Sequence, residues 1–170
     1  MSQIEVNSAI PAEQTLMEYT VAPSEQACAL KPTPVDVTKS LANRNIAIVA
    51  VPGAFTPTCS ERHIPPYIAR TGELKVDETW VISVNDPFVM AYWGRQLNVE
   101  SAPSVRFLAD GDATFVKALG LEKDCGSMMG VRSQRWSMVV TDGVVAYLNV
   151  EAPGKFEVSD VDTMIKQLNN

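Results

Sequence analysis

The chain has 170 residues, 46% of them hydrophobic and 20% charged, and carries a formal net charge of −6. This length and composition are typical of one soluble domain with a full hydrophobic core. The acidic balance argues against non-specific binding to nucleic acid or to an anionic membrane surface, and no stretch approaches the ~20 apolar residues of a transmembrane helix.

Residues 1–43 contain four prolines, at positions 11, 23, 32 and 34, and show little hydrophobic periodicity. We expect them to form an N-terminal arm packed on the rest of the chain, which could include one short hairpin. Residues 36–43 fit either a helical turn or a short loop.

From residue 45 onward, apolar runs alternate with segments of helical spacing. The continuous, β-branched run over 46–51 indicates a strand buried on both faces. Asp142-Gly143 is a strong signal for a two-residue hairpin turn. The predicted strands are 46–51, 79–84, 105–108, 136–141 and 144–150, and the predicted helices are 59–71, 87–97, 113–119 and 158–168.

Four residues bear on where these helices begin and bend. Pro87 suits the first position of its helix, and Ser159 is expected to cap the last helix. Pro65 and Pro66 lack an N–H group and should kink the helix that contains them.

The element order predicts an α/β domain over residues 44–170 with a thioredoxin-like fold, in which helices flank a central mixed sheet. With the arm over 1–43 it forms a single domain. The first strands should be parallel through helical crossovers, and the terminal hairpin should extend the sheet. Ligands of α/β sheets bind beyond the carboxyl ends of the strands. Cys59, which follows the strand over 46–51, is therefore expected at that edge.

The three cysteines, Cys28, Cys59 and Cys125, are too few and too scattered for a disulfide scaffold. With one histidine and no Cys-x-x-Cys pair, neither a metal site nor a cofactor is expected. The N-terminal MSQIEVNSAIPAEQ lacks the features of a secretory signal, and the C-terminal KQLNN lacks a peroxisomal Ser-Lys-Leu. A cytoplasmic, reducing location is therefore expected, where sparse cysteines are buried, catalytic or redox-active.

Cys59 lies in the segment VPGAFTPTCSERH, between a predicted strand and a predicted helix. Thr56 suits the cap of this helix and Pro57 its first position, which places Cys59 in the first turn. Free N–H groups and the positive end of a helix favour the thiolate, the nucleophilic form of cysteine. Cys59 is either a buried structural residue or a nucleophile, and a nucleophile would need a cationic partner and a second thiol.

The run Pro52-Gly53-Ala54-Phe55-Thr56-Pro57-Thr58-Cys59 resembles the Pro-x-x-x-Thr-x-x-Cys signature of peroxiredoxins, in the form typical of the type II subfamily, also called type 5. The resemblance covers roughly residues 40–168. It continues in the family's order through VNDPFVM at 84–90, FLAD at 107–110, ALG at 118–120 and RWSMVV at 135–140.

This resemblance implies roles for four residues. Cys59 would be the peroxidatic cysteine, Thr56 would hydrogen-bond its thiolate and the incoming peroxide, and Pro52 would shield the thiolate from water. Arg135 would hold the thiolate and stabilise the charge that develops between the peroxide oxygens. The alternative for Arg135 is an ordinary surface charge at the start of a strand.

Two neighbouring residues are weaker candidates. His63, the only histidine, lies one helical turn after Cys59. The resemblance implies that it positions Arg135 rather than acting as a general base, and a satisfied core or interface histidine is the alternative. Arg132, three residues before Arg135, has less claim to a direct role.

Turnover needs a second thiol, because attack on a peroxide converts the thiolate to sulfenic acid. The subfamily's usual resolving positions hold Val81 and Val158 here, so its usual intramolecular disulfide is not expected. A branch familiar from fungi instead has a cysteine near Cys28, which resolves the sulfenate of the partner subunit. Cys125, in a polar loop, is the alternative, and a one-cysteine cycle reduced by glutathione with glutaredoxin is the third.

The expected function is a thiol-dependent peroxidase for hydrogen peroxide and organic hydroperoxides, recycled by thioredoxin or by glutaredoxin and glutathione. The resemblance implies a homodimer, and neither a nucleic-acid nor a membrane partner is expected. Two alternatives stand beside it: a peroxide-driven sensor or relay that passes oxidation to partner proteins, and a non-catalytic thioredoxin-like module. Phe55, Phe88 and Trp93 fit either a dimer face or ordinary core.

Overall fold

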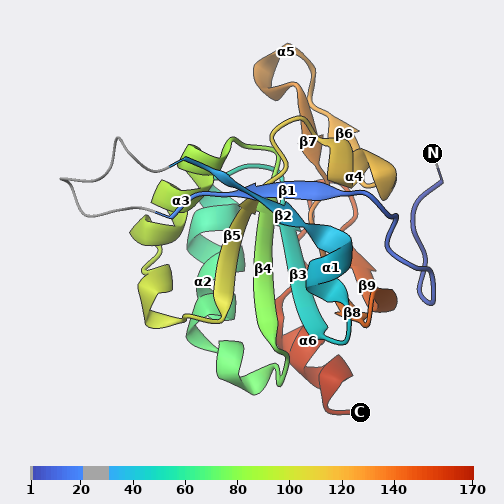
Figure 1. Cartoon of the computed structure of the whole chain (residues 1–170). Coiled ribbons are helices and arrows are strands. Elements are labelled where there is room, and N and C mark those ends of the chain that lie inside the picture. Colours follow the sequence, from blue (N-terminus) through green and yellow to red (C-terminus); the bar gives the residue numbers. More distant parts are fainter. Residues whose placement is uncertain (1, 21–30) are drawn as a thin grey trace.

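The computed structural model describes residues 2–20 and 31–170, which form a mixed β-sheet between two layers of helices (Figure 1). The strand order across the seven-stranded sheet is β2-β1-β5-β4-β3-β8-β9. The predicted thioredoxin-like α/β fold is thereby confirmed. The strands of this sheet are β1 (Thr15–Glu18), β2 (Thr33–Asp36), β3 (Asn45–Val51), β4 (Glu78–Ser83), β5 (Val105–Ala109), β8 (Trp136–Thr141) and β9 (Val144–Val150).

The centre of the sheet follows the predicted pairing. Strand β3 is parallel to β4, and β4 is parallel to β5, as helical crossovers require. The terminal hairpin β8–β9 adds antiparallel strands beside β3. Its turn residues Asp142 and Gly143 both have positive φ, +46° and +76°, as a two-residue hairpin turn demands.

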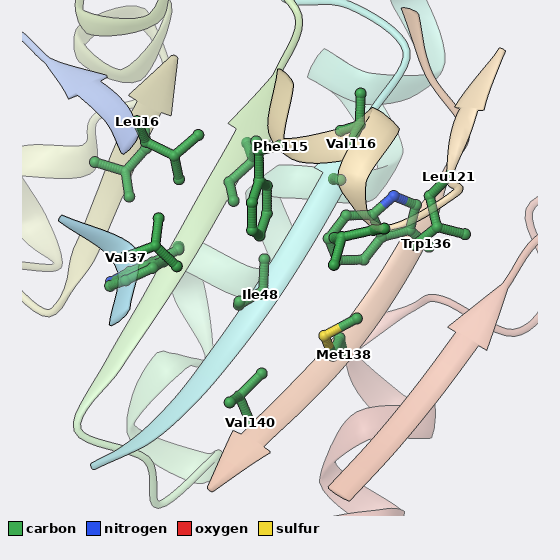
Figure 2. Packing of buried hydrophobic residues seen from close by; sticks show 14 of the residues in the cluster. Leu16, Val37, Ile48, Phe115, Val116, Leu121, Trp136, Met138 and Val140 are labelled. Carbon is green, nitrogen blue, oxygen red and sulfur yellow. The ribbon is translucent and has the colours of Figure 1, made fainter. Parts of the chain in front are cut away.

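Helices cover both faces of the sheet because its central strands are apolar on both sides. Even-numbered residues of β3, such as Ile48, face one apolar cluster with Trp136 and Met138 of β8 (Figure 2). Helices α1 (Val37–Leu41) and α4 (Thr114–Ala118) cover that face. The other face packs against α2 (Ile64–Ala69), α3 (Pro87–Gln96) and α6 (Val161–Leu168), and Cys59 belongs to that cluster.

The N-terminal arm takes part in the sheet. Strands β1 and β2 form an antiparallel pair, and Met17 of β1 pairs with Ala109 of β5, so the arm extends the sheet beyond β5. For residues 36–43, where the sequence fits a helical turn or a short loop, the helical turn is confirmed. Helix α1 begins after Asp36, whose carboxylate caps it. Cys28 lies outside the described residues.

Two predictions about the second half of the chain were wrong. Helix α6 begins at Val161 rather than Val158, and its cap is Asp160, whose side chain accepts from the Thr163 N–H. Ser159 lies one residue before this cap, and its hydroxyl donates to Glu151 instead.

The segment after α4 is also more ordered than the loop expected there. Strands β6 (Glu122–Asp124) and β7 (Val131–Ser133) form a small antiparallel sheet of their own, joined by helix α5 (Gly126–Met129), and this unit projects from the body (Figure 1). Cys125 lies between β6 and α5 and is half-buried. Among the described residues, no helix is both long and apolar enough to cross a membrane.

Candidate active site

Cys59 lies where the sequence places it, just past the carboxyl end of β3. The helix begins at Pro57, and the Ser60 N–H donates to the Thr56 carbonyl at 2.9 Å. The Thr56 hydroxyl points back along the chain and donates to the Gly53 carbonyl at 2.9 Å, instead of accepting from the first turn of the helix as expected. The Cys59 side chain has no exposed surface.

The helix that carries Cys59 changes geometry along its length. Residues Cys59–His63 form a π-helical turn, in which the Ile64 N–H donates to the Cys59 carbonyl five residues back. The α-helical part Ile64–Ala69 follows without a break and has Pro65 and Pro66 in its first turn, so two residues of this helix have no N–H to donate to the turn before them. Such π turns are frequent at functional sites.

The sheet brings Arg135 to Cys59 across 76 residues of sequence. Strand β8 runs antiparallel to β3 with Ala50 opposite Trp136, so the end of β3 and the start of β8 lie at the same edge. Because side chains alternate along a strand, Arg135 belongs to the face of Ser137 and Val139, which is also the face of Cys59. Its Nη2 donates to the Cys59 sulfur at 3.4 Å.

The same guanidinium also holds His63. Arg135 Nη1 lies 2.9 Å from His63 Nδ1, and a guanidinium can only donate, so Nδ1 accepts. The ring proton is therefore on Nε2, which donates to the Ser159 carbonyl at 2.9 Å. Burial, aided by the nearby Arg135 charge, lowers the pKa of His63 to about 4, against the opposing effect of Ser159. His63 is thus a neutral group that accepts a hydrogen bond from Arg135.

A cavity of about 570 Å³ opens beside these residues, lined among others by Pro52, Thr58, Arg62 and Arg135. Pro52 contributes no N–H group to it. The site therefore combines a buried thiol, a guanidinium that donates to its sulfur, and a cavity that reaches this guanidinium but not the sulfur itself. This arrangement suits attack by the sulfur on a small substrate whose reacting atoms gain negative charge.

Sequence reasoning missed three residues around this site. Glu151, Ser159 and Phe156 connect to His63 or Arg135 through hydrogen bonds and ring contacts. No local pattern marked them, since a carboxylate after a strand or a phenylalanine in a loop is common. Arg132 is close in sequence but donates to the carbonyls of Met129 and Val84.

The three aromatic residues left open by the sequence divide into two groups. Trp93 is fully buried and donates its indole N–H to Ser60 at 3.0 Å, so it is a core residue beside Cys59. Phe55 and Phe88 are about half exposed, at 49% and 48%. Phe55 also has a positive φ of 61°, which is uncommon for a residue with a side chain.

The low pKa of His63 predicts an acid-sensitive contribution to stability. As the pH falls from 7 to 5, the unfolded chain binds a proton at a histidine of ordinary pKa, near 6.5, while the folded chain does not. The free energy of unfolding should therefore decrease with falling pH, by about 2 kcal/mol from this group. Urea unfolding of the wild type and of His63→Gln at both pH values measures it. Equal losses in the two proteins would contradict the assignment.

The comparisons with known proteins agree on one family. A family model described as Redoxin matches residues 5–165. Peroxiredoxin-2B of Arabidopsis thaliana is 44% identical over 131 residues, which are 75% of this chain and 80% of that protein. Peroxiredoxin-2E-2, chloroplastic, of Oryza sativa subsp. japonica is 43% identical over 140 residues, which are 79% of this chain but only 62% of that protein.

A solved structure is similar to this chain over nearly its whole length. The crystal structure of reduced Prx3 from Vibrio vulnificus in complex with hydrogen peroxide has a TM-score of 0.87 and 43% sequence identity. The match covers 98% of this chain and 99% of that one.

The cytoplasmic location expected from the sequence is wrong on this comparison. Relatives from rice and Arabidopsis are named chloroplastic or mitochondrial, and the name of one from Lipomyces kononenkoae includes the word peroxisomal. The composition of a folded domain does not reveal its compartment, because a cellular address is a signal read by receptors.

Proposed function

The chain belongs to the Redoxin family, among its peroxiredoxins, and from this we propose that it reduces hydrogen peroxide and organic hydroperoxides through Cys59. The observation that carries the proposal is the guanidinium of Arg135, which reaches both the Cys59 sulfur and His63 Nδ1. The hydrogen peroxide in the Vibrio Prx3 structure supports the choice of substrate.

The reaction is a two-electron transfer from sulfur to peroxide. The Cys59 thiolate attacks one peroxide oxygen, an S–O bond forms and the O–O bond breaks. The leaving oxygen takes the electron pair of the O–O bond and a proton from solvent and departs as water or an alcohol, and Cys59 keeps the attacked oxygen with its hydrogen as sulfenic acid. Arg135 stabilises the negative charge that develops on the oxygens, a preorganised electrostatic effect.

Pro52 and Thr56 complete the proposed site. Pro52 lines the cavity and keeps further N–H donors away from the thiolate. The Thr56 hydroxyl donates to Gly53 in this structure and would turn toward the bound peroxide. Mixing the reduced protein with hydrogen peroxide in a stopped-flow instrument tests the function. A wild type that does not react would contradict it.

For resolution we propose Cys28 of a partner subunit, with recycling by thioredoxin or by glutaredoxin and glutathione. The positions where the subfamily usually has a resolving cysteine hold Val81, fully buried in β4, and Val158. The half-exposed rings of Phe55 and Phe88 support a homodimer whose interface lies near the site.

Non-reducing electrophoresis after one equivalent of peroxide tests the resolving thiol. On a denaturing gel we expect the wild type and Cys125→Ser to migrate as a covalent dimer, and Cys28→Ser to migrate as a monomer, because a disulfide between subunits needs both Cys59 and Cys28. A covalent dimer that persists in Cys28→Ser but disappears in Cys125→Ser would reassign the role to Cys125. Monomer in all three proteins would favour an external thiol.

A further inference from the structure

Glu151, the residue after β9, has a buried carboxylate with an unusual number of donors. Its side chain accepts from the backbone N–H groups of Glu157, Val158 and Ser159 and from the Ser159 hydroxyl, each at 2.8 Å. Glu151 is only 6% exposed. Burial alone would raise the pKa of Glu151, but the hydrogen bonds from Val158 and Ser159 outweigh it and lower that pKa. The carboxylate therefore fixes the backbone of the loop over 156–159.

The loop that Glu151 fixes presents two groups to the active site. The Ser159 carbonyl accepts from His63 Nε2 at 2.9 Å and from the Tyr67 hydroxyl at 2.8 Å. The Phe156 ring packs against the His63 ring, with centroids 4.9 Å apart, and its centroid lies 5.8 Å from the Arg135 guanidinium carbon. The loop thus contacts both His63 and Arg135, the residue that donates to the Cys59 sulfur.

The main chain of Glu151 makes a second, independent connection. Its N–H donates to the Arg135 carbonyl at 3.0 Å and continues the β8–β9 ladder. One residue therefore holds the backbone of Arg135 and, through the loop, the acceptor that orders its side-chain partner His63. A shift of this loop would move the Ser159 carbonyl and the Phe156 ring, which contact His63 and Arg135, while the main-chain bond to Arg135 would remain.

We propose that Glu151 is a positioning residue for the reaction at Cys59, which keeps His63 in its Nε2–H tautomer and thereby holds Arg135 against the sulfur. The proposal rests on the function proposed for Cys59. If the Ser159 carbonyl moves, the ring proton of His63 is free to shift to Nδ1. A protonated Nδ1 cannot accept from Arg135, because both atoms would then be donors.

The single histidine of this chain makes the tautomer directly measurable. Protein labelled with [¹⁵N]histidine gives one imidazole, and its two nitrogen shifts at pH 7 report which nitrogen is protonated. We expect the wild type to show a protonated Nε2 and an unprotonated Nδ1. Glu151→Ala should show averaged nitrogen shifts, and its second-order rate constant for oxidation by hydrogen peroxide should fall by about tenfold to a hundredfold.

Glu151→Gln is the conservative variant. Oε1 receives all four donors named above, so an amide oxygen in its place keeps them. The amide NH2 replaces Oε2 and loses only the second bond from the Glu157 N–H, at 2.9 Å. We expect Glu151→Gln to recover the Nε2–H tautomer and most of the rate. It also keeps the test valid if Glu151→Ala fails to fold.

Asp110 provides a matched control. It is 1% exposed and also accepts two backbone N–H groups, from Phe115 and Val116, but it orders α4 on the opposite face of the sheet from Cys59. Asp110→Ala should lose stability yet keep the tautomer and the rate of the folded protein. Equal changes in Asp110→Ala would overturn the proposal, as would Glu151→Ala with an intact Nε2–H tautomer and an unchanged rate.

The two measurements also separate this proposal from the proposed function. If the wild type fails to react with peroxide, the peroxidase assignment fails, whereas the tautomer comparison still shows whether Glu151 orders His63. If the wild type reacts and Glu151→Ala keeps its tautomer, only the positioning role fails.

Discussion

Replacing Cys59 with serine is expected to abolish the reaction of the reduced protein with hydrogen peroxide. A serine hydroxyl stays protonated at neutral pH and has no sulfur to be oxidised to a sulfenic acid, so it cannot replace the thiolate as the nucleophile. Removing a nucleophile in other enzymes has cost on the order of 10⁶ in rate, and we expect Cys59→Ser to react at the level of an unassisted thiol. Stopped-flow tryptophan fluorescence is a suitable probe, because Trp93 bonds Ser60, next to Cys59.

The comparison variant for this experiment is Cys125→Ser. Cys125 is half-buried between β6 and α5, and the structure gives it no contact with the Cys59 sulfur. Peroxide should therefore oxidise Cys59 in the Cys125→Ser protein as fast as in the wild type in a single turnover. A Cys59→Ser protein that reacts as fast as the wild type would place the reactive sulfur elsewhere.

Replacing Arg135 with methionine is expected to lower the second-order rate constant for peroxide by on the order of 10² to 10³. The change removes two hydrogen bonds, to the Cys59 sulfur at 3.4 Å and to His63 Nδ1 at 2.9 Å, while keeping much of the side-chain volume. Arg135→Lys should recover only part of the rate, because one ammonium cannot reproduce the planar fork that reaches both atoms.

Arg132→Met is the matched control for this arginine. The Arg132 guanidinium is also half-buried, but it donates to the carbonyls of Met129 and Val84 instead of the sulfur. The second-order rate constant of Arg132→Met with peroxide should stay close to that of the wild type. If Arg132→Met and Arg135→Met lose rate equally, the special position of Arg135 beside the sulfur has no kinetic meaning.

Much of the fold was predictable because strong local signals coincided with the tertiary structure. The run over 46–51 is apolar on both faces, and β3 is indeed buried on both faces. The Asp142-Gly143 pair needed positive φ and has it. The β6–β7 unit was missed because its strands are short and polar, so no periodicity reveals them.

The site was predictable only as far as its motif reached. Cys59 lies eight residues after the end of β3, within the motif, and the resemblance pointed to Arg135. The part of Glu151 depends on hydrogen bonds from residues six to eight positions later. Ser159 shows how tertiary contacts override local preference. It would make a good helix cap, yet its hydroxyl is engaged by Glu151, and Asp160 caps α6 instead.

The antiparallel ladder between β3 and β8 has a consequence for recovery of the protein from denaturation. This ladder brings the segments of Cys59 and Arg135 together, and it joins six residues of each strand, from Asn45↔Thr141 to Ala50↔Trp136. A slip of one residue turns every side chain of a strand to the other face. Arg135 would then leave the face of Cys59, even in a compact chain with near-native secondary structure. After refolding, the recovered peroxide reactivity therefore reports the fraction of molecules in which β3 and β8 pair in the native register. Circular dichroism reports all molecules with ordered strands, whatever their register.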